Sequence, residues 1–283
     1  MIDNAPFEIL ELELVAETDA HEGPVYVAEE DALYFTTLPR DGNVAIKRLD
    51  LASREISVLR EPANHANGMT LAPDGALIVC EQGDRSQAAR ISRVDRGTGE
   101  AETVIDAYRG LPFNSPNDVV VASDGTIWFT DPSYGHLQGF RPAPQLPDQV
   151  YRHDPRTGDT TVAATGFDKP NGLAFSPDEQ VLYVGDNGAP QELLAFDLRD
   201  GAARRRVAAG TPEHPDGLKV DSEGRIYASA STGIHVFDPT GALLGEITLP
   251  GAVIFTFGGL DRNVLFITRD DSIWAAHLDA KGA

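Results

Sequence analysis

The chain repeats one pattern of polar and apolar positions about six times. Each copy has a polar or glycine anchor, a short apolar strand, a turn and a second apolar strand. The clearest copy lies within Leu111 to Gly135, where Asn117-Asp118 precedes VVVASDGTIWFT. Short apolar runs separated by Asp-Gly turns are typical of antiparallel strands. The other copies start at Glu22-Gly23, Asn67-Gly68, Asn171-Gly172, Asp216-Gly217 and, last, Phe255.

The spacing of the copies predicts the architecture. Successive anchors lie roughly 40 to 55 residues apart, which is the range for propeller blades of four strands. Third strands are expected at 45–50, 90–95, 149–153, 192–197 and 233–237, most of them followed by an aspartate that caps a turn. A two-sheet sandwich does not explain this period. We therefore expect an all-β, six-bladed β-propeller, with residues 1–283 forming a single domain.

The sixth copy is one strand short. After the strand expected at 272–277 there is no fourth strand. The run from Phe7 to Val15 alternates apolar and polar residues as a half-buried strand does. We expect this N-terminal strand to pair into the last blade and close the ring, which also removes an exposed sheet edge.

Charge and composition narrow the class of partner. Lys+Arg 23 against Asp+Glu 44 gives a net charge of −21, which repels nucleic acid phosphates and anionic membranes. No stretch reaches the roughly 20 apolar residues that span a bilayer, and the acidic N-terminus does not resemble a signal peptide. Cys80 is the only cysteine, so no intrachain disulfide is expected. We expect a cytoplasmic protein, a monomer or small homo-oligomer, that binds neither nucleic acid nor membrane.

The anchors form the candidate site. The first strand of each propeller blade lines the central channel, so residues at its start face one mouth of the channel. Five copies place a carboxylate or amide there, and these oxygen donors suit Ca²⁺, Mg²⁺ or Mn²⁺ better than Zn²⁺. The simpler alternative is that each Asx-Gly pair only makes a turn. The five equivalent residues favour a ring of oxygens; they are Glu22, Asn67, Asn117, Asn171 and Asp216.

At these residues the chain resembles the gluconolactonase, senescence marker protein and luciferin-regenerating enzyme family. The resemblance runs from HEGPVY at His21 to FGGLDRNVLFIT, and includes NSPNDVVVASDGTIWFTDPSYG, KPNGLAFSPDEQVLYVGDN and HPDGLKVDSEGRIYAS. It implies a six-bladed propeller with one divalent cation in the channel, usually Ca²⁺, with Mg²⁺, Mn²⁺ or Zn²⁺ as alternatives. It also implies hydrolysis of sugar lactones such as gluconolactone, so a small-molecule lactone is the expected partner.

The resemblance assigns roles to single residues. Glu22, Asn171 and Asp216 match the metal ligands of the family, and Asn117 matches a further ligand or substrate contact. Asp216 is also the candidate general base. His214, two residues before it, is an alternative base.

Other polar residues are candidates for substrate contacts. Asn67, Asn114 and Asn117 are expected to orient the hydroxyls or the ring oxygen of the lactone. Four residues that follow the second strands of the third and fourth copies are candidate walls of the pocket: Asp131, Tyr134, Asp186 and Asn187.

Three positions depart from the family pattern. Leu111-Pro112 stand where relatives often carry Lys-Arg, so a basic substrate contact is missing there. Gln82 replaces the usual histidine of a Glu-His-Gly motif, and Ile254 stands where asparagine is common in the last repeat. These changes bear on which lactone is bound and leave the metal set intact.

Three functions fit these residues. In a metal-assisted lactonase, the cation binds the lactone carbonyl and stabilises the oxyanion formed when water adds. A calcium-dependent phosphotriesterase could use the same scaffold, and a non-catalytic ligand-binding propeller could hold a structural cation. No Gly-x-Ser-x-Gly motif and no phosphate-binding glycine loop is present. We therefore expect a metal-dependent lactonase.

Overall fold

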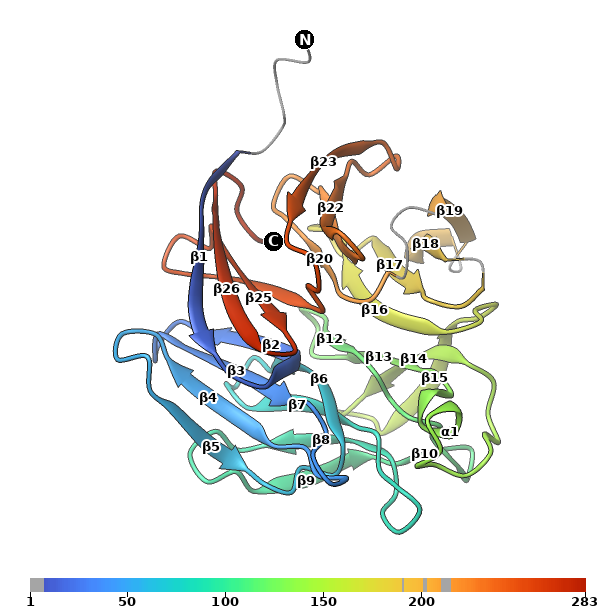
Figure 1. Cartoon of the computed structure of the whole chain (residues 1–283). Helices are drawn as coiled ribbons and strands as arrows, with labels where there is room; N and C mark the ends of the chain where they lie inside the picture. Colours follow the sequence, from blue (N-terminus) through green and yellow to red (C-terminus); the bar gives the residue numbers. More distant parts are fainter. Residues whose placement is uncertain (1–7, 190, 201–202, 210–214) are drawn as a thin grey trace.

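Six four-stranded antiparallel sheets surround a central channel (Figure 1). The structure is a computed structural model that describes residues 8–189, 191–200, 203–209 and 215–283. The β-propeller expected from the repeat is therefore confirmed.

In blades 1 to 3 the strands follow chain order from the channel outwards. Blade 1 comprises β2 (Ala20–Val27), β3 (Ala32–Thr37), β4 (Ile46–Asp50) and β5 (Ile56–Arg60). Blade 2 comprises β6 (Ala66–Leu71), β7 (Leu77–Glu81), β8 (Arg90–Val94) and β9 (Ala101–Ile105). Blade 3 comprises β12 (Val119–Val121), β13 (Ile127–Asp131), β14 (Gln149–Asp154) and β15 (Asp159–Ala164).

Blades 4 and 5 have the same order, and blade 6 adds the N-terminal strand. Blade 4 comprises β16 (Pro170–Phe175), β17 (Val181–Asp186), β18 (Glu192–Asp197) and β19 (Ala203–Ala209). Blade 5 comprises β20 (Leu218–Val220), β21 (Ile226–Ala230), β22 (Gly233–Phe237) and β23 (Leu243–Thr248). Blade 6 comprises β24 (Phe255–Gly258), β25 (Val264–Arg269), β26 (Ser272–Leu278) and β1 (Ile9–Glu17).

The ring closes through blade 6. β1 pairs antiparallel with β26, from Ile9 opposite Leu278 to Glu17 opposite Ser272. The predicted N-terminal strand is confirmed over Ile9–Glu17, and Phe7, where it was expected to begin, lies outside the described residues. The innermost strands of neighbouring blades are in contact all the way round, and β24 of blade 6 contacts β2 of blade 1.

The hydrophobic core lies between the blades. Side chains of a strand alternate between the two faces of its sheet, so each blade can bury apolar residues against both neighbours. Val25 and Tyr34 of blade 1 pack with Met69 of blade 2 in one cluster. Phe35 of blade 1 packs with Phe266 of blade 6 in another.

The aspartates that follow third strands cap turns, as predicted. Asp95 Oδ1 accepts hydrogen bonds from the N–H groups of Gly97 at 2.9 Å and Thr98 at 2.8 Å. Asp238 Oδ1 accepts one from Thr240 N–H at 2.8 Å. These carboxylates stabilise the turns between the outer strands.

Three short elements are insertions that the repeat does not predict. They are the hairpin of β10 (Ala107–Tyr108) and β11 (Leu111–Pro112), the helix α1 (Tyr134–Leu137) and the 3₁₀ turn η1 (Leu198–Asp200). Since α1 has only four residues, no helix in the described ranges is long enough to cross a membrane.

Deleting residues 1–16 should lower the melting temperature by roughly 10 °C or more, because blade 6 loses its outer strand and β26 becomes an exposed edge. Thermal unfolding followed by circular dichroism measures this. Leu10→Ser is the matched control, since Leu10 lies on β1 but is 60% exposed, and it should shift melting by about a degree or two. A deletion variant that melts with the full chain would show that β1 does not hold the ring closed.

Candidate functional site

The backbones of successive anchors touch around the channel. Gly68 N–H donates to the carbonyl oxygen of Asn117 at 2.8 Å, and Gly172 N–H donates to that of Asp216 at 2.8 Å. A Cβ added to Gly172 would lie 2.1 Å from the Asp216 carbonyl oxygen, so a side chain there would push blades 4 and 5 apart. At these positions the Asx-Gly pair makes a contact between blades, and the alternative that it only makes a turn does not hold.

The anchor side chains converge on one cavity of about 260 Å³. Three of the anchors lie near the starts of β2, β6 and β16, and the other two lie just before β12 and β20. All five predicted anchors line the cavity: Glu22, Asn67, Asn117, Asn171 and Asp216. The rest of the lining is His21, Thr37, Pro39, Val44, His65, Ala66, Gln82, Tyr134, Gln138, Phe140 and Asn187.

Two oxygens of this cavity have no partner. Asn117 Oδ1 and Asp216 Oδ1 are buried and accept no hydrogen bond from the described residues. A buried polar atom without a partner costs about 1–3 kcal/mol. A divalent cation with oxygen ligands would satisfy both atoms, so the side chains fit such a group.

The donor set is mixed rather than purely acidic. Within the described ranges, no group of three or more His, Cys, Asp or Glu side chains is placed to hold a metal ion. The cavity instead combines two carboxylates, Glu22 and Asp216, with three amides. Amide oxygens are normal ligands for Ca²⁺, so this composition agrees with a calcium site better than with a zinc site.

The acids repel one another in a buried setting. Burial, followed by the charges of Asp216 and Asp118, raises the pKa of Glu22 well above its usual range, while Lys219 offsets part of this effect. Burial and the charge of Asp118 also raise the pKa of Asp216 to about 7, although a hydrogen bond from Asn171 lowers it. A bound cation would relieve this repulsion.

Asp118 is a buried acid outside the cavity lining whose charge acts on Glu22 and Asp216, and the sequence analysis does not single it out. It is 2% exposed, and burial raises the pKa of its carboxyl. Its Oδ1 accepts a hydrogen bond from Val119 N–H at 2.9 Å, and its Oδ2 accepts one from Leu173 N–H at 3.4 Å. The signal in the sequence is the Asn-Asp pair at a place where other copies have Asx-Gly.

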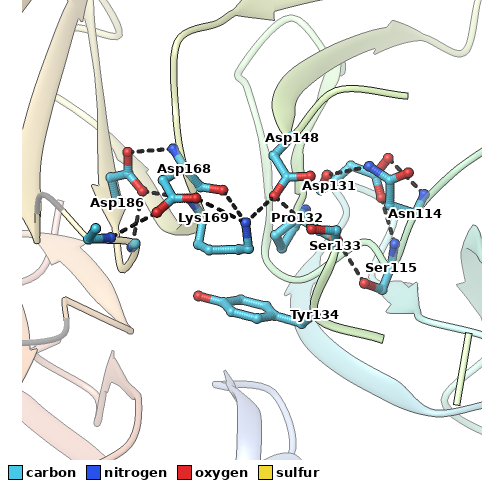
Figure 2. Close-up of polar contacts among 12 residues, drawn as sticks. Asn114, Ser115, Asp131, Pro132, Ser133, Tyr134, Asp148, Asp168, Lys169 and Asp186 are labelled. Atoms are coloured by element: carbon cyan, nitrogen blue, oxygen red, sulfur yellow. Dashed lines mark hydrogen bonds and ion pairs between the residues drawn. The ribbon is translucent and has the colours of Figure 1, made fainter. Parts of the chain in front are cut away.

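Asn114 does not line the cavity, which corrects its expected role as a substrate contact. Its Nδ2 donates to the carbonyl oxygens of Asp131 at 3.2 Å and Leu146 at 3.1 Å. Its N–H donates to Asp131 Oδ2 at 2.9 Å. Asn114 therefore fixes the loop before β12 to the end of β13 (Figure 2).

The expected wall residues divide into two groups. Tyr134 and Asn187 line the cavity, but Asp131 and Asp186 do not. Asp131 is fully buried in the loop network just described. Asp186 has the equivalent task in blade 4, where its carboxylate accepts backbone N–H groups from residues 168 and 169 at 2.9 and 2.7 Å.

Blade 6 places no side-chain oxygen in the cavity lining. The residue at its anchor position is also not the one expected. Val253 N–H donates to the Thr268 carbonyl at 2.9 Å, as Asn117 N–H does to Thr130. Val253 therefore holds the anchor position, and the interpretation that placed Ile254 there is wrong by one residue. The sixth copy could not be aligned with the others from the sequence, because no polar residue marks the anchor position before β24.

The structure also locates the other residues that depart from the family pattern. Gln82 lines the cavity. Leu111 and Pro112 form β11 and are absent from the lining, so no basic group is supplied from there. His214 lies outside the described residues.

Two rings of the cavity lining, those of His65 and Phe140, are not predicted by the repeat. The imidazole of His65 stacks on the ring of Phe140, with 4.7 Å between centroids and 7° between planes. His65 has a backbone φ of 54°, which is unusual for a residue with a side chain. Burial lowers its pKa, which favours the neutral imidazole. Only its position two residues before Asn67 could have indicated it.

Comparison with known proteins places this site in a family. The model of the SMP-30/Gluconolactonase/LRE-like region matches residues 20–270. The chain belongs to this family. Among members of the SMP-30/gluconolactonase group, a gluconolactonase from Zymomonas mobilis is 33% identical over 254 residues, which is 80% of this chain and 69% of that protein.

Solved structures agree with this assignment. XC5397 from Xanthomonas campestris, described as a gluconolactonase, is 37% identical with a TM-score of 0.85, over 94% of this chain and 89% of that one. Regucalcin from Agrobacterium tumefaciens, described as a calcium-binding protein, is 19% identical with a TM-score of 0.76, over 97% and 94%. The second likeness shows a shared fold alone. The family resemblance of the anchor motifs is thus confirmed.

The chelated protein should lose stability as pH rises from about 5 to 8. The folded-state pKa of Asp216 is raised to about 7, against about 4 in the unfolded chain. Between these values the folded state holds a proton that unfolding releases, so the free energy of unfolding falls with increasing pH. Asp216→Asn removes this titration and should melt roughly 5 °C above the wild type at pH 8.

Thermal melts in chelator at pH 5 and pH 8 check this expectation. Glu29→Gln, which changes an exposed acid, is the control and should follow the wild type. If Asp216→Asn gained nothing at pH 8 relative to pH 5, the carboxyl would not carry the raised pKa.

Proposed function

We propose that this protein is a cation-dependent lactonase that opens small, uncharged sugar lactones. The observation that carries the proposal is the pair of buried, unpartnered oxygens of Asn117 and Asp216 beside the Glu22 carboxylate in one cavity. The gluconolactonases among its relatives support a lactone as the substrate.

Four side chains would hold the cation: Glu22, Asn117, Asn171 and Asp216. Ca²⁺ is our first choice because all four offer hard oxygen ligands, and Mg²⁺, Mn²⁺ and Zn²⁺ are the alternatives to test. When bound, the ion would polarise the lactone carbonyl.

The lining of the cavity supports an uncharged substrate. Its volume of about 260 Å³ is below the range typical of sites for drug-sized ligands. Among the described residues, the lining contains no Lys or Arg, and its basic residues are His21 and His65. The two carboxylates, Glu22 and Asp216, would balance the charge of a bound divalent cation. A phosphate or carboxylate on the lactone would therefore meet no further strong counter-charge among the described lining residues.

Asp216 is the proposed general base. In the metal-free protein, burial and the charge of Asp118 raise its pKa to about 7. A bound cation would lower this pKa and favour the carboxylate, which is the form that accepts a proton. A water oxygen bonds to the carbonyl carbon while a proton of that water passes to Asp216. The bond between the carbonyl carbon and the ring oxygen then breaks, the ring oxygen takes up a proton, and the product is a hydroxy acid.

The Asn67 amide would orient the substrate. Its Nδ2 donates to the Asn117 carbonyl oxygen at 3.1 Å, which fixes the plane of the amide. Its Oδ1 is then the natural acceptor for a sugar hydroxyl, and Asn117 lies beside it.

Glu22→Gln and Asp216→Asn should each lower lactone hydrolysis by at least about 100-fold and weaken cation binding, while the β-rich circular dichroism spectrum is retained. The reason is that each removes one of only two charges that hold the cation. Stopped assays of turnover and calorimetric titration of the chelated protein measure the two effects. Asp95→Asn, a turn carboxylate, is the control. Full activity of either site variant after chelation and dialysis would refute the assignment of the metal site.

A panel of substrates separates the proposed function from its rivals. Chelated protein is assayed with neutral sugar lactones, a phosphorylated lactone and a phosphotriester, with Ca²⁺, Mg²⁺, Mn²⁺ or Zn²⁺ added back. We expect cation-restored turnover of the neutral lactones. Turnover of the phosphotriester alone would indicate a phosphotriesterase, and cation binding without any turnover would indicate a binding propeller.

A further inference from the structure

Tyr134 brings a hydroxyl into the cavity beside the proposed cation ligands. Its oxygen accepts a hydrogen bond from Asn171 Nδ2 at 3.4 Å, and its side chain lines the same cavity as Glu22 and Asp216. A tyrosine hydroxyl can accept and donate at the same time. Because Asn171 is the donor here, the hydroxyl proton stays available, and no contact within the described ranges uses it.

A chain of polar contacts fixes the segment that carries Tyr134. Ser133 Oγ donates to Asp148 Oδ2 at 3.0 Å, and Lys169 Nζ lies 2.9 Å from the same oxygen. Lys169 also pairs with Asp168 Oδ1 at 3.1 Å. The residue before Tyr134 is thus linked to a residue two positions before Asn171, so the partners of the 3.4 Å contact are coupled through the protein.

Figure 2 shows this arrangement: the Tyr134 ring lies below the Lys169 side chain in this view, and no dashed contact joins its hydroxyl to Lys169 or Asp148. The side chains of Lys169 and Asp148 are only 18% and 11% exposed. An ion pair so shielded is screened less by salt than a surface pair. It can therefore hold the loops of blades 3 and 4 in one relative position.

A second set of contacts holds the other side of the segment. Ser115 Oγ donates to the Pro132 carbonyl oxygen at 2.7 Å and accepts a hydrogen bond from Gly135 N–H at 2.9 Å. Tyr134 therefore stands between two fixed neighbours, Ser133 and Gly135. Such preorganisation is what makes a hydrogen-bond donor effective toward developing charge.

The amide groups of two anchors are already engaged as donors. Asn171 Nδ2 already donates to Tyr134, and Asn67 Nδ2 already donates to the Asn117 carbonyl oxygen. The carboxylates of Glu22 and Asp216 are acceptors when ionised. Thr37, Gln82 and Gln138 also line the cavity, but the Tyr134 hydroxyl is the donor that contacts a proposed cation ligand, Asn171. It is therefore placed near a lactone carbonyl that meets the cation.

On the basis of the proposed lactonase activity, we propose that Tyr134 is a catalytic hydrogen-bond donor to the carbonyl oxygen of the lactone. The negative charge on this oxygen grows as water adds to the carbonyl carbon. The proton stays on Tyr134, so no bond of the tyrosine is made or broken. Ser133, Asp148 and Lys169 are the positioning residues of this donor.

Tyr134→Phe removes the donor alone. We expect kcat/KM on a neutral sugar lactone to fall about 100-fold, the size seen when one oxyanion donor is removed, mostly through kcat, with calorimetric cation affinity changed less than about threefold. Tyr26→Phe is the matched control. The Tyr26 hydroxyl donates to Asp31 Oδ1 at 2.9 Å, and Tyr26 does not line the cavity, so this variant should keep wild-type kcat. A kcat for Tyr134→Phe within about threefold of wild type would overturn the inference.

The positioning residues are tested by Lys169→Met and Lys169→Arg. The methionine variant should lower kcat about tenfold and Lys169→Arg should restore most of it, with cation affinity measured in parallel. Arg199→Met, which breaks the exposed pair with Asp197, is the control. A wild-type kcat in Lys169→Met would refute the role given to the Asp148–Lys169 pair.

A binding measurement separates this inference from the proposed function. A sugar lactam keeps the carbonyl oxygen but resists hydrolysis, so it probes the donor without turnover. Tyr134→Phe should bind the lactam about tenfold more weakly than the wild type. If the wild type cleaves no lactone, the proposed function fails; if both proteins bind the lactam equally, the donor role of Tyr134 fails whether or not lactones are cleaved.

Discussion

The close backbone contact between successive anchors is the constraint on which both the ring and the site depend. The N–H of Gly172 reaches the Asp216 carbonyl oxygen at 2.8 Å, and there is no room between them for a Cβ. The contact sets how near the inner strands of two blades come at the channel. It also fixes the backbone from which the anchor side chains project. The same contact therefore determines how the blades pack and where the oxygen donors lie.

The sequence predicts what the repeat expresses in every copy. Strands, turn aspartates such as Asp95 and anchors such as Glu22 and Asn171 recur at fixed places, because each blade must bury the same two faces and enter the channel at the same point. A residue at a repeated position inherits its location from the others. For this reason the sequence could predict that the anchors share one site, although they are spread over nearly 200 residues of chain, from Glu22 to Asp216.

The features that escaped prediction occur once. Asn114 is the same residue type as Asn117 and lies three positions away, yet it stabilises a loop, because the choice depends on the three-dimensional course of the segment before β12. Phe140 comes from an insertion in a single blade, so no other copy indicates where it points. Tyr134, at the start of the same insertion, could be predicted as a wall of the pocket but not as a partner of Asn171. The apolar Val253 offers no polar side chain to reveal its equivalence with the anchors.

The pairing of β1 with β26 has a consequence for the order of folding. It joins Ile9 to Leu278, and contacts between residues so distant along a chain form slowly because of the entropy lost on closing a long loop. During synthesis, blades 1 to 5 can associate before β26 has left the ribosome. Blade 1, which carries Glu22, gains its second neighbour only when β24 packs against β2. The oxygen ring is therefore completed in the last stage of folding, and a nascent chain has no complete cation site until then.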